Sequence, residues 1–146
     1  TTKAQGEKMG EALQAINTGQ LTCSRFLAEY RGPQPNGKIV QVAVIDGKGV
    51  SRELKEGRTV RLRSAKMDPA ECKRLVMLAV RGKLWKAPPK DALKKAQNRL
   101  VIGIKDIGKL AVPLSSRHVW RQQAIDGLRQ GLLAIAQRFA AADRNR

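Results

Sequence analysis

Residues 39–49 read Ile-Val-Gln-Val-Ala-Val-Ile-Asp-Gly-Lys-Gly. The first seven are rich in β-branched side chains, which favour strands, and the turn-forming residues 33–37 come just before them. Asp46-Gly47 then predicts a hairpin turn, because this pair tolerates the positive φ that tight turns need. We therefore expect a strand near residues 38–46 that turns back into a second strand near 50–54.

Further strands are expected on either side of the next helix. Glu56-Gly57 indicates another turn, and residues 59–63 (Thr-Val-Arg-Leu-Arg) alternate apolar and basic side chains with the period of a strand near 58–65. Such alternation predicts one buried face and an opposite face that exposes Arg61 and Arg63. A second hairpin is expected near 99–105 and 109–114, with its turn at 106–109.

Helical spacing of apolar residues predicts the remaining elements. A first helix is expected over 3–16, and Asp68-Pro69 predicts the start of another that runs to about Arg81. Residues 22–30 step by three and four, which favours a second N-terminal helix, with a strand as the alternative. Two such opening helices would also allow a helix-turn-helix, a less favoured reading. A long C-terminal helix over 116–142 carries an apolar stripe, made of Trp120, Ala124, Leu128, Leu132, Ile135, Ala136 and Phe139.

These elements predict an α+β fold in a single domain, residues 1–146, with an antiparallel sheet built from hairpins and packed on helices. Residues 1–32 form an N-terminal helical segment in this interpretation, and 143–146 form a frayed tail. One face of the sheet is expected to lie under the helices and the other to face solvent. The stripe of the last helix is longer than one small sheet is expected to cover, which favours a homodimer or a higher homo-oligomer.

The charge of the chain points to its partner. Its 29 Lys and Arg residues outnumber 12 Asp and Glu, so the formal net charge is +17. Residues 48–109 hold most of this excess, about +12 by sequence count. A compact domain with such a charge repels itself unless an anion neutralises it, which predicts a polyanionic partner, RNA or DNA.

The expected contacts are basic residues on strands and turns, together with one indole in a basic loop. The predicted nucleic-acid-binding residues are Lys48, Arg52, Arg58, Arg61, Arg63, Lys66, Lys83, Trp85, Lys86, Lys94 and Lys95. Trp85 is expected either to stack on a base or to close the edge of the core. With only two Trp, two Phe and one Tyr, the chain favours contacts to the phosphate backbone of RNA or single-stranded DNA, with low sequence specificity.

The two cysteines and the hydropathy suggest a compartment. Cys23 and Cys72 have no second ligand at metal-binding spacing, so no metal or cofactor is expected, and two reduced thiols are favoured over one disulfide. No run of apolar residues is long enough for a bilayer and no secretory signal is recognised, which predicts no membrane association and an intracellular location.

Enzymatic signals are sparse, so we expect a protein without catalytic residues. One alternative is a small metal-dependent nuclease built on Asp46, Glu53 and Lys55, which have suitable residue types for holding Mg²⁺ and positioning water. Another is a structural role, in which a nucleocapsid-like packaging protein or a ribosome-type component coats nucleic acid with the same charge.

Overall fold

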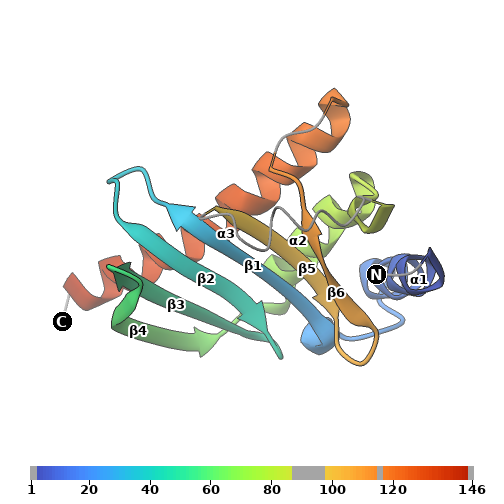
Figure 1. The fold of residues 1–146 in the computed structure, drawn as a ribbon. Helices are drawn as coiled ribbons and strands as arrows, with labels where there is room; N and C mark the ends of the chain where they lie inside the picture. The colour runs from blue at the N-terminus through green and yellow to red at the C-terminus, as the bar shows by residue number, and fades with distance from the viewer. Residues whose placement is uncertain (1–2, 87–97, 115–116, 145–146) are drawn as a thin grey trace.

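The computed structural model describes residues 3–86, 98–114 and 117–144. The fold is α+β as predicted, and the described residues form one six-stranded antiparallel sheet and three α-helices (Figure 1). In chain order they are α1 (Lys3–Asn17), the short 3-10 helix η1 (Cys23–Arg25), β1 (Phe26–Pro33), β2 (Ile39–Ile45), β3 (Lys48–Lys55), β4 (Arg58–Lys66), α2 (Pro69–Arg81), the 3-10 helix η2 (Leu84–Lys86), β5 (Arg99–Ile104), β6 (Gly108–Val112) and α3 (Val119–Arg144).

The sheet has the strand order β4-β3-β2-β1-β5-β6, and every neighbouring pair is antiparallel. Two-residue turns join β2 to β3 and β3 to β4. In both turns the two residues have positive φ: Asp46 and Gly47 in the first, Glu56 and Gly57 in the second. Such turns match the right-handed twist of the strands they join, so the predicted meander forms as the sequence indicates.

All three helices pack on one face of the sheet, which we call the covered face (Figure 1). α3 crosses β1, β2 and β3, while α2 lies between α1 and α3. Phe26, Val42, Ile102, Leu128 and Leu132 in the layer between sheet and helices are fully buried. None of the helices in the described part of the chain lies over the opposite face, which we call the open face, as the sequence predicts for an antiparallel sheet with one wet side.

The segment predicted as a second N-terminal helix is instead the central strand β1, so the helix prediction for 22–30 is wrong and the strand alternative holds. The burial of β1 alternates, with Phe26, Ala28 and Tyr30 inside. Pairing with β2 on one side and β5 on the other outweighs the helical spacing of these residues. Because residues 26–33 form a strand, the predictions of a helix-turn-helix and of a helical segment over residues 1–32 are also wrong.

The apolar stripe of α3 is covered by the chain itself. Leu128, Leu132 and Ile135 are fully buried, and Ala124 and Ala136 nearly so. Most of the stripe is therefore covered within the protein itself. The reason for expecting a homo-oligomer, an apolar helix surface left uncovered, does not hold over most of the helix. Asp143, expected in a frayed tail, lies in the last turn of α3.

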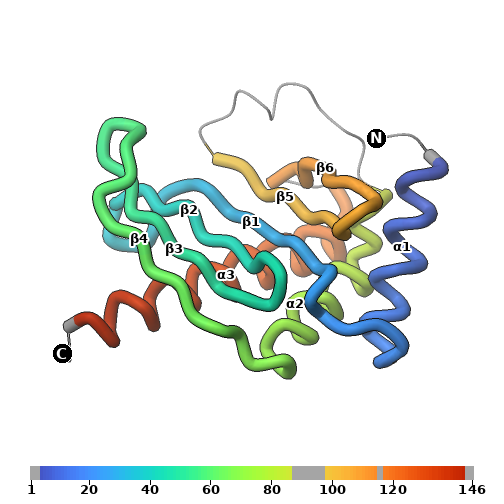
Figure 2. The backbone as a smooth tube through the Cα atoms, turned by 90° about the horizontal axis from the view of Figure 1, so that it is seen from below, coloured from blue at the N-terminus to red at the C-terminus, as the bar shows by residue number. Residues whose placement is uncertain are grey.

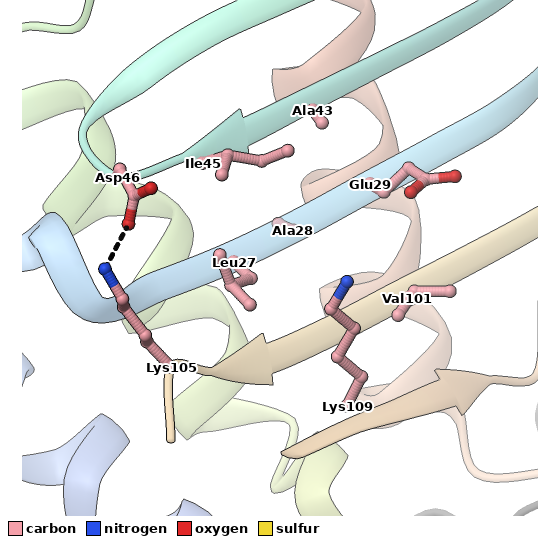
Figure 3. Close-up of a pocket in the computed structure, with 9 residues that line it drawn as sticks. All are labelled: Leu27, Ala28, Glu29, Ala43, Ile45, Asp46, Val101, Lys105 and Lys109. Atoms are coloured by element: carbon pink, nitrogen blue, oxygen red, sulfur yellow. Dashed lines mark hydrogen bonds and ion pairs between the residues drawn. The ribbon is translucent and has the colours of Figure 1, made fainter. Parts of the chain in front are cut away.

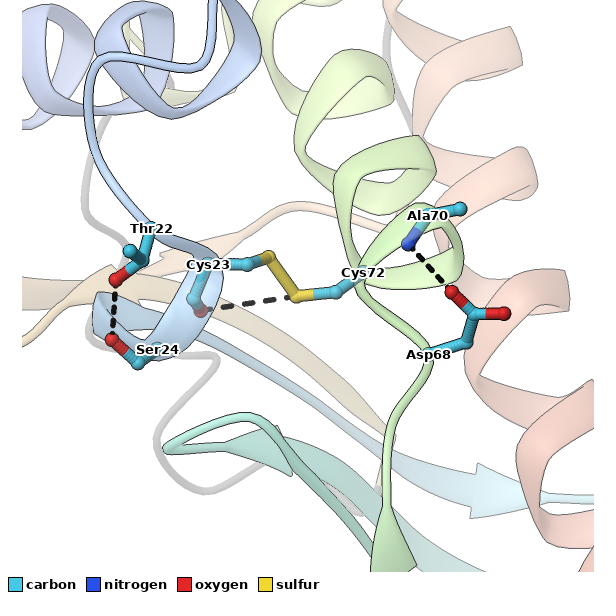
Figure 4. The surroundings of a disulfide bond; sticks show 6 residues. All are labelled: Thr22, Cys23, Ser24, Asp68, Ala70 and Cys72. Carbon is cyan, nitrogen blue, oxygen red and sulfur yellow. Dashed lines mark hydrogen bonds between the residues drawn. A yellow bond between two sulfur atoms is a disulfide. The ribbon is translucent and has the colours of Figure 1, made fainter.

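Cys23 and Cys72 form a disulfide with their Cα atoms 6.4 Å apart, so the expectation of two reduced thiols is wrong (Figure 4). The bond joins η1, at the start of β1, to the first turn of α2. That turn begins as predicted, because the Asp68 carboxylate accepts a hydrogen bond from the Ala70 backbone N–H at 2.9 Å and Pro69 follows the cap.

Candidate polyanion-binding face

The register of the strands arranges the open face in cross-strand rows. One row carries Leu62, Arg52, Gln41, Arg31 and Arg99, from β4 to β5. The next row carries Ser64, Val50, Ala43, Glu29, Val101 and Ala111. The third carries Lys66, Lys48, Ile45, Leu27, Gly103 and Lys109. Two rows that contain basic side chains thus flank one that is mainly apolar.

Four cations of the open face have no ion pair within the described part of the chain: Arg31, Arg52, Lys48 and Lys66. Both described carboxylates of this face are paired with other cations. Glu29 accepts a hydrogen bond from Arg99 at 3.0 Å, and Asp46 lies 3.5 Å from Lys105. The carboxylates of the face are therefore engaged elsewhere, which leaves these four cations available to an external anion.

A shallow pocket of about 240 Å³ lies at the middle of the open face (Figure 3). Its floor is apolar, with Leu27, Ala43, Ile45 and Val101 contributed by three neighbouring strands. Lysines and carboxylates surround this floor, namely Lys105 and Lys109 with Glu29 and Asp46. The face thus offers apolar contact area bordered by charge.

Strand β4 is oriented opposite to the prediction, with its apolar side chains exposed and its arginines on the covered side. Val60 and Leu62 are 59% and 58% exposed, while Arg61 and Arg63 point to the covered side, where Arg63 pairs with Glu53 at 3.3 Å and with Asp143 of α3. The prediction that Arg61 and Arg63 lie on the open face is therefore wrong: Arg63 is largely buried, and Arg61, although exposed to solvent, belongs to the covered side by its register. The physical reason is that β4 is an edge strand beyond most of the helical layer, so no core is available to bury Val60 and Leu62 (Figure 2).

The Arg63 guanidinium is held firmly in this arrangement. Burial alone would lower its pKa, but hydrogen bonds and charge attraction from Asp143 and Glu53 outweigh that effect and raise the pKa above its ordinary value. Its donors are used within the fold, which makes it a link between β4 and the end of α3. Arg63 is thus a structural cation in this geometry.

The other predicted contacts are scattered. Lys48, Arg52 and Lys66 lie together on the open face, whereas Arg58 lies at the end of the β3–β4 hairpin. Lys83, Trp85 and Lys86 follow α2 on the helical side. Lys94 and Lys95 lie outside the described residues.

Trp85 is half-buried and packs against α1, so close that a Cβ added at Gly10 would lie 2.6 Å from the indole. It fits the core-edge reading of this residue. None of the five aromatic residues, all described, lies on the open face: Phe26 and Tyr30 point inward from β1, Trp85 is in η2, and Trp120 and Phe139 are in α3.

Sequence reasoning missed Arg31 because it placed residues 22–30 in a helix. The signal that finds Arg31 is period-two alternation across the end of that segment, in which Leu27, Glu29 and Arg31 alternate with the buried side chains of β1. The exposed Val60 and Leu62 were also missed, since alternation reports two faces without saying which one is covered.

The residues of the nuclease alternative do not converge. Asp46 lies in the β2–β3 turn beside Lys105, while Glu53 lies near the other end of β3 and binds Arg63 on the covered face. Over residues 3–86, 98–114 and 117–144, no group of three His, Cys, Asp or Glu side chains is arranged to hold a metal ion.

Comparison of the chain with known protein families finds no matching family, and comparison with curated proteins finds no significant match. Within the described residues, no helix combines the length and apolar character needed to cross a bilayer.

Proposed function

We propose that this protein binds a polyanion, single-stranded RNA or DNA, along the open face of its sheet. The observation that carries the proposal is the set of four cations, Arg31, Arg52, Lys48 and Lys66, that share this face and have no carboxylate partner in the described part of the chain. Phosphates would supply the missing counter-charge, and their binding would release condensed ions.

The spacing of these cations suits an extended chain of phosphates. Neighbouring strands lie about 4.8 Å apart, so Arg52 and Arg31, separated by β2, are roughly 10 Å apart. Lys48 is four residues from Arg52 along β3, or about 13 Å. Cations at such intervals on a flat surface can each meet a different phosphate of one strand.

The apolar row between the basic rows favours a single strand over a duplex. Val50 and Val101, both half-buried, offer contact area to bases or sugars that a single strand can lay against the sheet, whereas a duplex keeps its bases stacked inside. No aromatic side chain is available on this face for stacking, so recognition would rest on the backbone. We therefore expect little sequence preference.

The disulfide bears on where such binding would occur. An intracellular location was expected with reduced thiols, but disulfides persist mainly in oxidising compartments. The Cys23–Cys72 bond therefore favours an environment outside the reducing cytosol, and the polyanion would be met there. Alkylation of the protein in freshly lysed cells, followed by mass measurement, would show which state predominates.

The test compares two variants with equal changes in net charge. The first carries Arg31→Gln, Arg52→Gln, Lys48→Gln and Lys66→Gln on the open face. The matched control carries Lys8→Gln, Arg74→Gln, Arg81→Gln and Lys86→Gln, four exposed cations of the helical side. Affinity for labelled single- and double-stranded RNA and DNA is measured by fluorescence anisotropy at several salt concentrations.

We expect the open-face variant to bind single strands far more weakly than the control. The salt dependence of its log affinity should be flatter by about 0.7 for each phosphate that the variant no longer neutralises. Equal weakening in both variants would mean that net charge and not the open face governs binding, which would overturn the proposal. Unchanged binding in the open-face variant would do the same.

A further inference from the structure

A second cavity, of about 580 Å³, lies between the end of α1, the β2–β3 turn and the start of α2. Its size falls within the range of about 300–1,000 Å³ that small-molecule sites occupy. The wall is largely apolar: Ile16 and Met67 are buried, Leu21 is half-buried, and the Cys23–Cys72 disulfide forms part of the lining (Figure 4).

The walls of this cavity are held in place by covalent and hydrogen bonds. The disulfide fixes η1 to α2 on one side. The Met67 backbone N–H donates to the Gly47 carbonyl at 2.9 Å, which joins the β2–β3 turn to the segment before α2. A cavity with such fixed walls is available to a ligand without a large ordering cost.

The charged residues that line the cavity are mainly positive. Lys48, Lys66 and Lys73 line it, all exposed and without an ion pair among the described residues. Asp46 also lines it, but its carboxylate is engaged by Lys105 at 3.5 Å. The hydroxyls of Thr22 and Ser24 are hydrogen-bonded to each other at 2.6 Å. The mouth therefore favours a ligand that ends in an anionic group.

We propose that this cavity binds the hydrocarbon chain of an anionic amphiphile, with its carboxylate or phosphate among the three lysines. A polar ligand fits poorly, because its buried hydrogen-bonding groups would find few partners along an apolar wall. An acyl chain gains from the same wall, because each methylene that it places there is removed from water. The cavity shares Lys48 and Lys66 with the open face, whereas Lys73 lies on α2 and the apolar wall lies outside that face, so an amphiphile and a polyanion would compete for two of the lysines.

The probe is 11-(dansylamino)undecanoic acid, whose fluorescence rises in an apolar site. Bound probe is displaced with dodecanoate, lysophosphatidic acid, dodecyltrimethylammonium and dodecyl maltoside, each below its micellar concentration. We expect one or both anionic amphiphiles to displace the probe at concentrations at least tenfold lower than the cationic and neutral ones. The relative potency of dodecanoate and lysophosphatidic acid distinguishes a free fatty acid from a phospholipid as the preferred source of the chain.

Variants test the location of the site. Leu21→Trp and Ser24→Trp each place an indole in the cavity, whereas Leu62→Trp places one on the open face as a control. Both cavity variants should bind the probe at least tenfold more weakly, and the control should bind it as the native protein does. Ser24 is exposed, so its variant keeps the test valid if Leu21→Trp fails to fold.

The headgroup is tested with Lys73→Glu, which should weaken dodecanoate and spare dodecyl maltoside. Equal displacement by all four amphiphiles, or full binding in both cavity variants, would overturn the proposal. Because Lys73→Glu leaves Arg31, Arg52, Lys48 and Lys66 intact, nucleic-acid binding measured on the same sample shows separately whether the open face works.

Discussion

The two faces of the sheet differ in how their charges are satisfied. On the covered face, Arg63 is nearly buried and bound by two carboxylates, Glu53 from the neighbouring strand and Asp143 from α3. On the open face, Arg52 stands on the same β3–β4 pair with no carboxylate partner in the described part of the chain. Similar arginines of one hairpin thus differ in their partners: Arg63 links β4 to α3, whereas Arg52 is one of the cations that we propose to bind a ligand.

The largest expected change in stability comes from shortening an apolar side chain of the covered face, compared with one of the open face. Leu132→Ala removes a fully buried side chain beneath the sheet and should lower the free energy of unfolding by about 2–5 kcal/mol. Leu62→Ala, on the open face, should change it by about 0.5 kcal/mol or less. Denaturant titration measures both. A decrease for Leu62→Ala as large as that for Leu132→Ala would mean that the isolated protein already covers its open face.

Removal of the disulfide should cause the next largest loss of stability. The double variant Cys23→Ser with Cys72→Ser should lose about 2–4 kcal/mol of unfolding free energy, because the broken cross-link releases a loop spanning 49 residues. Reductant should destabilise the native protein to a similar extent and leave the variant unchanged. Thermal unfolding with and without reductant provides the measurement, and a native protein insensitive to reductant would contradict the expected role.

Arg61 and Arg63 lie on the same side of β4 and provide a direct test of the ion pairs that only Arg63 makes among the described residues. Arg63→Gln leaves two carboxylates without their partner and should cost about 1–3 kcal/mol. Arg61→Gln alters an exposed side chain with no ion pair among the described residues and should cost about 0.5 kcal/mol or less. If chemical denaturation gave equal decreases for the two, the pairing of Arg63 with Glu53 and Asp143 would not contribute to stability as expected.

The smallest effect concerns Tyr30, which points into the core and donates to the Pro33 carbonyl at 3.2 Å. Burial raises its pKa above the ordinary value, and nearby Arg129 opposes this only in part. The folded protein therefore resists ionisation of this tyrosine. Its contribution to stability should be complete below about pH 10 and should be lost as the pH rises through the folded-state pKa.

Tyr30 is the only tyrosine, so tyrosinate absorbance reports it alone. The absorbance should rise at higher pH in the folded protein than in denaturant. Tyr30→Phe, which removes the ionising group, should reduce the loss of stability above about pH 10. Identical titration in the folded and denatured states would contradict the burial of its hydroxyl.

Local patterns predicted most of the fold, because Asp46-Gly47, Glu56-Gly57 and Asp68-Pro69 act through their own backbone preferences. The predictions failed where contacts between distant parts of the chain determine the local structure. The Arg63 side faces the helices because Asp143 arrives from 80 residues away. β1 is a strand because β2 and β5 pair with it, and the cysteines bond because α2 packs beside η1.

The candidate site was predicted only in part for the same reason. Lys48, Arg52 and Lys66 fall on strands that the sequence indicates locally, whereas Arg31 joins them through a strand that required knowledge of its neighbours. The second cavity is lined by residues from three separate segments of the chain, near the end of α1, at the β2–β3 turn and at the start of α2. No residue spacing in the sequence indicates that these segments lie side by side.

The disulfide also has a consequence for the order of folding. β1 pairs with β5, and residues 26 and 104 that meet there are roughly 80 residues apart along the chain. Once Cys23 and Cys72 are joined, the shortest covalent path between these strands falls to roughly 35 residues, which lowers the entropy cost of closing the loop by about 0.7 kcal/mol. In the oxidised chain, the centre of the sheet is thus completed across a loop of about half the length.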